Sequence, residues 1–180
     1  RGMDFVLVQD YENALKDMER AIELDPGMAM AHFARAVIRT KQLEYQSQQT
    51  REPALLDTGN EKELSILNDL PGRVKRPEFS LESLEYDGIL KDYEAILQIA
   101  PDFIFAYYNR AEIFILEKDY RAAIADYTRA INLEPQFAEA YFNRGISRLS
   151  IGETQDGLDD LRKAGELGIV QSYSIIKRMQ

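Results

Sequence analysis

The sequence repeats itself with a period of about 34 residues, and this period restricts the architectures that the chain can adopt. Tyr107 and Tyr141 stand at equivalent positions, as do Pro101 and Pro135, and one period separates the members of each pair. A fixed period of about 20 to 50 residues is typical of arrays in which each repeat packs only on its neighbours. The sequence therefore predicts a stack of similar units.

Each unit is predicted to contain two amphipathic helices. Apolar residues recur at spacings of three and four, as in Ile124, Tyr127 and Ile131, which is the helical pattern. Small residues at fixed positions, such as Ala111 and Gly145, allow two helices to approach closely. A proline that ends the second helix follows it in three units, at Pro26, Pro101 and Pro135.

A 34-residue unit with an aromatic residue, a small residue and then an Ala–aromatic–Ala–Pro series resembles the tetratricopeptide repeat (TPR) family. The segments YYNRA and YFNRG are similar to those of arrays common in bacterial proteins. The resemblance implies an all-α, right-handed solenoid of helix pairs that ends in a capping helix. It also implies that the first helices of the pairs line a concave face, which binds extended peptides or partner helices.

The repeat alignment also gives the boundaries of the units. They are 1–27 (a truncated first repeat with the end of a first helix plus a second helix), 28–103, 104–137, 138–169 and the capping helix 170–180. The interval from Pro26 to Pro101 exceeds the period by 41, so an insertion is placed at about 42–85. We expect a partly helical excursion there, with a short helix over 60–70. Because Arg1 aligns with the middle of a first helix, we expect the natural protein to continue before it.

Arginine and aspartate recur at two fixed positions of the repeat. The aspartate follows the arginine at i+16 in the uninterrupted repeats and at i+57 in the second, and the difference equals the length of the insertion. The pairs are Arg1–Asp17, Arg35–Asp92, Arg110–Asp126 and Arg144–Asp160. Because a guanidinium group fits a carboxylate through two hydrogen bonds, we expect structural ion pairs between the two helices of each repeat. Catalytic acids are the less favoured interpretation of these aspartates.

The family resemblance also implies a set of groove residues on the first helices. They are Phe33, Val37, Phe105, Tyr108, Asn109, Glu112, Phe142, Asn143 and Ile146. The rings of Phe33, Tyr108 and Phe142 are expected in one row, where they either anchor a ligand or pack against neighbouring repeats. Glu112 and Glu139 beside them favour a ligand that carries Lys or Arg.

Relatives that dock chaperone tails hold a terminal carboxylate with lysines, arginines and asparagines in this groove. Asn109 and Asn143 match the asparagine positions, but two of the lysine positions hold Phe33 and Glu139. Binding of a chaperone tail is therefore not expected for this chain.

Composition removes several other classes of function. The chain has 22 Lys and Arg against 31 Asp and Glu, a net charge of −9, which argues against nucleic acid and against an anionic membrane surface. It has no cysteine, so thiolate nucleophiles and cysteine metal sites are excluded. Its longest apolar runs are too short to span a bilayer. His32, the single histidine, stands at the position of Tyr107, where a packing ring is expected rather than a general base.

These observations predict a non-catalytic protein–protein interaction scaffold, without cofactor or metal, that binds a peptide or helix with apolar anchors in the concave groove. The alternative is a regulatory or accessory domain of a larger enzyme or cell-envelope system whose chemistry lies outside these residues.

Overall fold

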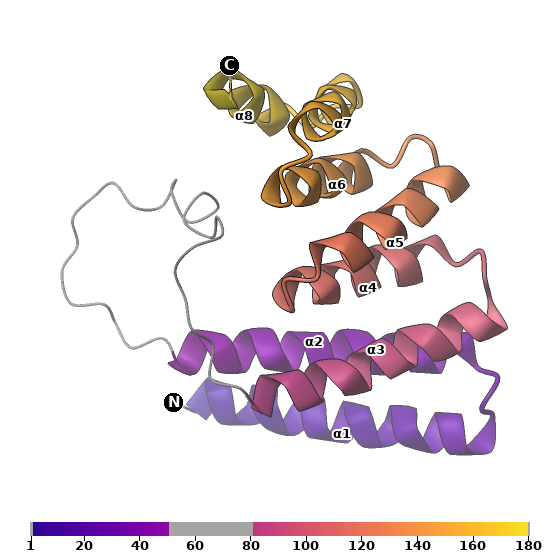
Figure 1. Cartoon of the computed structure of the whole chain (residues 1–180). Helices are drawn as coiled ribbons and strands as arrows, with labels where there is room; N and C mark the ends of the chain where they lie inside the picture. The colour runs from indigo at the N-terminus through magenta and orange to yellow at the C-terminus, as the bar shows by residue number, and fades with distance from the viewer. Residues whose placement is uncertain (1, 51–80, 180) are drawn as a thin grey trace.

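Helix pairs stack along one axis in the computed structural model, which describes residues 2–50 and 81–179 (Figure 1). Side chains are described for residues 10–46 and 86–179. The helices of these residues are α1 (Gly2–Leu24), α2 (Ala29–Thr50), α3 (Leu81–Ile99), α4 (Ile104–Leu116), α5 (Tyr120–Leu133), α6 (Ala138–Ser150), α7 (Thr154–Glu166) and α8 (Gln171–Met179). The described residues contain no strand, which confirms the all-α helical solenoid.

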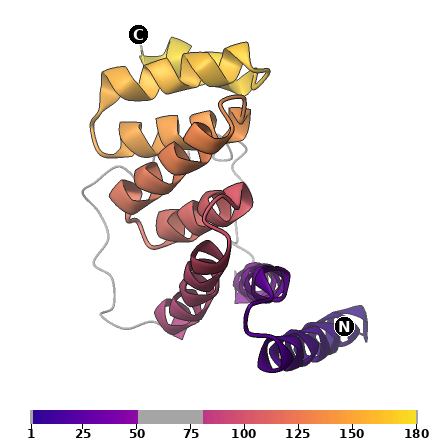
Figure 2. The ribbon, with the colours of Figure 1, turned by 90° about the vertical axis from the view of Figure 1, so that its right-hand side faces the viewer.

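The helices pack in the order in which they occur in the sequence. Contacts join each helix to the next one along the chain, and α1 and α8 lie at opposite ends of the stack (Figures 1 and 2). The core is divided among three apolar clusters, one for each pair α2–α3, α4–α5 and α6–α7 with the helix that follows it. The fold is therefore built from nearest-neighbour interfaces, as expected for repeat proteins.

Short turns with a left-handed residue join the two helices of the third and fourth repeats. Lys118 has a φ of 62° and Gly152 a φ of 85°. The carboxylate of Asp119 then accepts a hydrogen bond of 3.0 Å from the backbone nitrogen of Ala122 and caps the start of α5. These turns bring the second helix back against the first.

The first repeat differs from the expectation. Residues 1–27 were expected to hold the end of a first helix, a turn and a second helix. Instead, α1 is one helix from Gly2 to Leu24. In the repeat alignment, Gln9 stands at the position of Lys118, the turn residue with a positive φ. A turn in the first repeat would therefore require a positive φ at Gln9. That conformation is costly for residues other than glycine, and a continuous helix avoids this cost.

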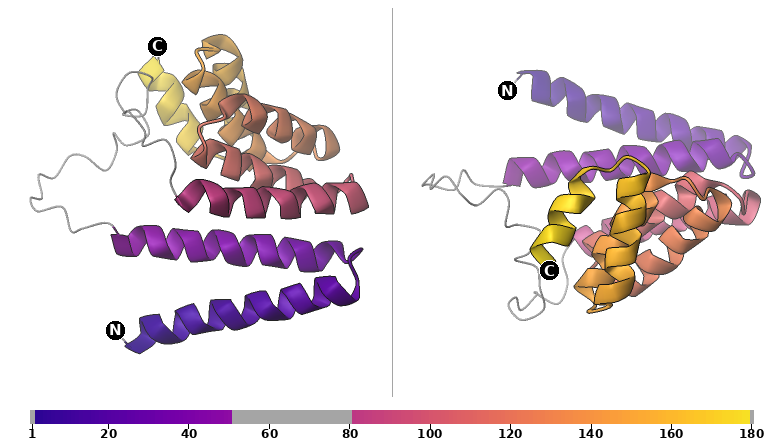
Figure 3. Two further views of the ribbon diagram at one scale, coloured as in Figure 1. Left: turned by 60° about the horizontal axis from the view of Figure 1, so that its bottom comes forward. Right: turned by 90° about the horizontal axis from the view of Figure 1, so that it is seen from above.

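The helices on either side of the insertion are longer than their counterparts. α2 and α3 contain 22 and 19 residues, whereas α4 and α5 contain 13 and 14. Residues 42–50 and 81–85, which were expected in the insertion, therefore continue these two helices. Residues 51–80, with the short helix expected over 60–70, lie outside the described residues. The three long helices α1, α2 and α3 lie side by side (Figure 3).

The C-terminal helix α8 continues the repeat order. α6 begins at Ala138, and one period later is position 172. α8 begins at Gln171, one residue before that position. Ile176 joins the apolar cluster of α6 and α7 and is 8% exposed. α8 thus covers the last repeat, in the place where a further first helix would stack.

Candidate functional site

The arginine–aspartate pairs of the third and fourth repeats lie between the two helices of each repeat. Arg110 donates from Nε to Oδ2 of Asp126 at 2.7 Å and from Nη2 to Oδ1 at 2.8 Å. Arg144 binds Asp160 in the same bidentate geometry, from Nε to Oδ2 at 2.8 Å and from Nη2 to Oδ1 at 2.7 Å. The aspartates are 6% and 5% exposed. The hydrogen bond to Asp126 raises the pKa of Arg110 above its usual value, and each pair joins the two helices of its repeat.

The second repeat contains the same pair across its insertion. Arg35 donates from Nε to Oδ2 of Asp92 at 3.0 Å, and its Nη2 contacts Oδ1. This hydrogen bond raises the pKa of Arg35. In the first repeat, Arg1 lies outside the described residues, and Asp17 is exposed.

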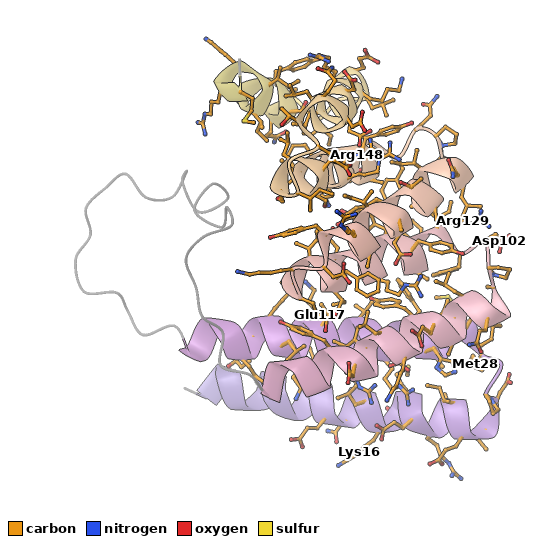
Figure 4. All side chains as sticks on the ribbon, in the orientation of Figure 1. Lys16, Met28, Asp102, Glu117, Arg129 and Arg148 are labelled. Atoms are coloured by element: carbon orange, nitrogen blue, oxygen red, sulfur yellow. The ribbon has the colours of Figure 1, made fainter. Side chains whose placement is uncertain are left out.

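A second arginine on the same aspartates was missed by the sequence analysis. Arg39 donates from Nη1 to Asp92 at 3.0 Å, and Arg148, which extends between α6 and α7, donates from Nη1 to Asp160 at 2.8 Å (Figure 4). The third repeat has Phe114 at this position. Arg39 and Arg148 are separated by the same interval as Arg35 and Arg144, and this spacing is the signal that identifies them.

His32 has the structural role of the tyrosine that replaces it in other repeats. Its Nε2 lies 3.1 Å from the carbonyl oxygen of Pro26, and the hydroxyl of Tyr107 donates to the carbonyl oxygen of Pro101 at the same distance. Because a carbonyl only accepts, Nε2 is the donor. Both side chains therefore tie a first helix to the end of the preceding second helix.

The three rings expected in one row are partly buried, and two of them pack against equivalent rings just before the next first helix. Phe33 lies with its centroid 5.2 Å from that of Phe103, and Tyr108 lies 4.8 Å from Phe137. Phe142 packs instead in the apolar cluster of α6, α7 and α8. The partner rings are the residues just before α4 and α6 and are themselves one period apart, a spacing that the sequence analysis did not use.

One ring remains substantially exposed within this set of aromatic contacts. The centroid of Phe105 lies 6.3 Å from that of Phe103 and 6.2 Å from that of Phe137. Phe105 is nevertheless 56% exposed. Phe105 therefore contacts two rings and is still more than half exposed.

A polar cluster joins α4, α5 and α6 beside these rings. Asn143 donates from Nδ2 to the hydroxyl of Tyr108 at 3.0 Å and to Oε1 of Glu112 at 2.7 Å. The hydroxyl of Tyr127 donates to the same oxygen of Glu112. Burial, with smaller effects of Glu112 and Glu139, raises the pKa of Tyr108 to about 12, and burial also raises the pKa of Tyr127. The tyrosines are thus protonated donors or acceptors in this cluster.

The remaining predicted groove residues are only partly accessible. Asn109 forms a hydrogen bond with the hydroxyl of Tyr93, which corresponds to the contact of Asn143 with the tyrosine cluster one repeat later. Ile146 packs against the cluster of α6, α7 and α8, and Val37 is half-buried.

One repeat position is exposed in each of the first helices α2, α4 and α6 and in α8. We call this set the first-helix row: Met30, Phe105, Glu139 and Tyr173. Met30 is 59% exposed and Tyr173 is 50% exposed. The sequence analysis named Phe105 as a groove residue and placed Glu139 beside the groove, whereas Tyr173 belongs to α8.

The described residues offer little for metal chemistry. No group of three or more His, Cys, Asp and Glu side chains in this part of the chain is arranged to hold a metal ion. Among the same residues, every helix is too short or too polar to cross a membrane.

Family models and solved structures agree with this architecture. A model described as a tetratricopeptide repeat matches residues 1–47, and one described as a TPR repeat matches residues 112–152. No curated protein matches the chain.

Three solved structures illustrate the similarity of fold. MamA from Desulfovibrio magneticus RS-1 is 14% identical, with a TM-score of 0.64 over 99% of this chain and 80% of that chain. The first TPR of Spaghetti (RPAP3), bound to an HSP90 peptide, is 20% identical, with a TM-score of 0.50 over 54% and 79%. The Arabidopsis OM64 TPR domain is 21% identical, with a TM-score of 0.50 over 55% and 84%.

At these identities the solved structures show the fold alone. Two further observations support tetratricopeptide repeats: the matches to the family models, and the Arg–Asp, tyrosine and proline positions that recur in successive helix pairs. Residues 1–47 and 112–152 therefore match tetratricopeptide repeats, and the described helix pairs form a TPR-like helical solenoid.

Proposed function

We propose that the chain is a non-catalytic scaffold that binds a peptide or helix of another protein along the first-helix row, with Phe105 as the central anchor. The observation that carries this proposal is the exposure of Phe105, at 56%, between two rings that hold it. Aromatic side chains are frequent anchors at interfaces, because they bury a large area with few rotatable bonds. A ring that is already fixed loses little further entropy on binding.

The charges around Phe105 favour a ligand with basic side chains. Glu139 is exposed in the first-helix row, and Glu112 is half-buried on the same helix as Phe105. Carboxylates beside an apolar anchor attract Lys or Arg and repel acidic groups. The HSP90 peptide in the RPAP3 structure, SRMEEVD, contains two glutamates and one aspartate. The ligand proposed here has the opposite charge.

Selection from a library of random peptides tests this proposal directly. We expect the enriched peptides to combine an aromatic or large aliphatic residue with Lys or Arg. Phe105→Ala should weaken their binding by about 2 kcal/mol, the cost typical of a central interface residue. Glu139→Lys should shift the enriched peptides toward acidic sequences.

A matched control is Leu24→Ala, because Leu24 is a 74% exposed apolar residue on α1, outside the first-helix row. This variant should bind as the wild type does. Enrichment of acidic peptides by the wild type, or equal binding by Phe105→Ala, would contradict the proposal.

The alternative, an accessory domain of a larger enzyme or envelope system, would use the same row. This alternative would be favoured if the chain bound a segment of that larger enzyme or envelope system more tightly than it bound library peptides.

A further inference from the structure

The first-helix row changes in chemical character along the stack. Phe105 of α4 and Tyr173 of α8 are exposed rings, and Glu139 of α6 stands between them in the repeat order. Exposure at this repeat position does not depend on where α8 ends, because Phe105 and Glu139 are exposed although further helices are stacked beyond them. The row therefore offers two apolar surfaces with one carboxylate between them.

The carboxylate of Glu139 is available to a ligand. Among the described residues, no side chain forms a hydrogen bond or an ion pair with it. Glu112 differs, because its Oε1 accepts hydrogen bonds from Nδ2 of Asn143 and from the hydroxyl of Tyr127. Glu139, rather than Glu112, is therefore the carboxylate that a basic side chain of a ligand would meet.

The ring of Tyr173 lies on a glycine of the preceding helix. A Cβ atom on Gly165 of α7 would lie 2.6 Å from Cζ of Tyr173 and 2.9 Å from its Cε2. The equivalent residue of the third repeat is Ile131, so the glycine makes room for the ring against the backbone of α7. Tyr173 therefore contacts α7 and is still half exposed.

Successive members of the row lie about 10 Å apart, the spacing of packed helices. Side chains join α4 to α6, because Phe105 contacts Phe137, the residue just before α6. They also join α6 to α8, because Phe142 and Ile176 share one apolar cluster. Three residues of an extended, polyproline II chain cover about 9 Å and return to the same face. Every third residue of an extended ligand would therefore meet the row.

An α-helical ligand matches the row less well. Seven helical residues also cover about 10.5 Å, but the residues three and four positions along face the same side and would meet the surface between the members of the row. Glu139 is the one exposed residue of α6, and α4 exposes only Phe105 and Leu116. A segment that touches each of these helices once therefore fits the exposed positions better than a helix does.

We propose that the ligand is an extended segment of another protein in which a Lys or Arg is flanked on each side, three residues away, by a large apolar residue. The apolar residues pack on Phe105 and Tyr173, and the basic residue pairs with Glu139. The pattern rests on the proposed function and adds the order and spacing of the ligand's residues. Because the pattern reads the same in both directions, it holds for either direction of the bound chain.

Heptapeptides with blocked ends test the pattern by isothermal titration calorimetry. FAARAAF has the proposed pattern, FAAEAAF reverses its central charge, and FARAAAF keeps its composition but moves the arginine by one residue. The wild-type chain should bind FAARAAF about tenfold more tightly than FAAEAAF and about fivefold more tightly than FARAAAF. Glu139→Lys should invert the order of FAARAAF and FAAEAAF.

Gly165→Ala tests how Tyr173 is positioned. The added Cβ atom would displace the ring, so the variant should bind FAARAAF about fivefold more weakly, as Tyr173→Ala should. Adding Gly165→Ala to Tyr173→Ala should cause no further loss, because the two changes remove the same contact. Circular dichroism of each variant checks that the fold is intact.

The matched control is Met30→Ala. Met30 is an exposed apolar member of the row, but it precedes Phe105 in the repeat order, beyond the reach of a heptapeptide that spans Phe105, Glu139 and Tyr173. This variant should bind FAARAAF as the wild type does. A loss equal to that of Phe105→Ala would overturn the proposed register.

Three other results would overturn the pattern. They are equal binding of FAARAAF and FARAAAF, no preference for FAARAAF over FAAEAAF, and tighter binding of a fifteen-residue helical peptide with the same three residues seven apart. If Phe105→Ala still weakened the binding of library peptides, the proposed function would stand and only the order and spacing would be wrong. Absence of binding by the heptapeptides and by every library peptide would contradict both.

Discussion

Gly145 of α6 and Gly157 of α7 face each other backbone to backbone. A Cβ atom on Gly157 would lie 2.9 Å from the carbonyl oxygen of Gly145, and a Cβ atom on Gly145 would lie 3.0 Å from the carbonyl oxygen of Gly157. The first distance is shorter than real Cβ atoms show, and the second is tighter than most Cβ contacts. The contact brings the two helices together, and Arg144, next to Gly145, then reaches the buried Asp160.

The first prediction concerns this close approach. Gly157→Ala should destabilise the chain by about 1–2 kcal/mol in urea unfolding, because the cost of overpacking exceeds the gain in helix propensity. Gly88→Ala is the matched control. Its Cβ would meet only the Arg39 guanidinium, at 3.4 Å, so the same substitution should stabilise α3 by up to about 1 kcal/mol. Equal effects of the two changes would contradict the role of the close approach.

The second prediction compares aspartates with one and two arginines. Arg110→Ala should lower the free energy of unfolding by about 3 kcal/mol, because it leaves Asp126 buried without its partner. Arg148→Ala should cost less than half as much, since Asp160 keeps the two hydrogen bonds of Arg144. Both values come from urea unfolding followed by circular dichroism. A larger loss for Arg148→Ala would show that the second arginine, not the first, dominates the pair.

The repeat period predicts most of the fold because each unit depends on its neighbours alone. The positions of Tyr107, Arg110 and Asp126 recur with fixed spacing, so the helices and their ion pairs follow from alignment. The continuous α1 does not follow, because the choice between a turn at Gln9 and one long helix depends on the backbone strain of the turn and on the packing that would offset it. The repeat alignment gives residue positions and does not give these two energies.

Side-chain exposure is harder to predict than helix positions. Phe33, Tyr108 and Phe142 occupy the same repeat position, but their burial depends on what the next unit places against them. Phe103 and Phe137 cover two of these rings, and α8 covers the third. The alignment therefore located the first helices, whereas the choice of Phe105 as the open ring required the packed structure.

The third prediction concerns alkaline pH. Burial raises the pKa of Tyr108 from 10.0 to about 12, which means that the folded chain holds this proton more tightly than the unfolded chain. Its contribution to stability is complete below pH 10 and is lost as the pH rises to about 12. Tyr108→Phe should therefore show a smaller fall in the free energy of unfolding across this range.

The control for this titration is Tyr173→Phe, which removes the hydroxyl of a half-exposed ring on α8. Its stability across the same pH range is the reference for losing a tyrosine hydroxyl outside the polar cluster of α4, α5 and α6. An identical dependence for wild type and Tyr108→Phe would show that the Tyr108 hydroxyl does not contribute.

The fourth prediction uses the exchange of histidine and tyrosine between repeats. His32→Tyr should keep the stability of the chain within about 0.5 kcal/mol, because the hydroxyl of Tyr107 already makes the equivalent bond to Pro101. His32→Phe fills the same space without a donor, and it should cost about 1 kcal/mol because the carbonyl oxygen of Pro26 loses its hydrogen bond. Thermal melts of the two variants measure the difference, and a more stable phenylalanine variant would contradict it.

The fifth prediction concerns the segment between α2 and α3. These helices pack through Ala36, Ile89 and Tyr93, which are at most 1% exposed, and the Arg35–Asp92 pair joins them. Replacing residues 51–80 with a short glycine–serine linker should therefore leave one cooperative helical melt. Each halving of the loop lowers its closure cost by about 0.6 kcal/mol, so the midpoint should stay the same or rise slightly. A broad, uncooperative melt, measured by circular dichroism, would show that the replaced residues belong to the core.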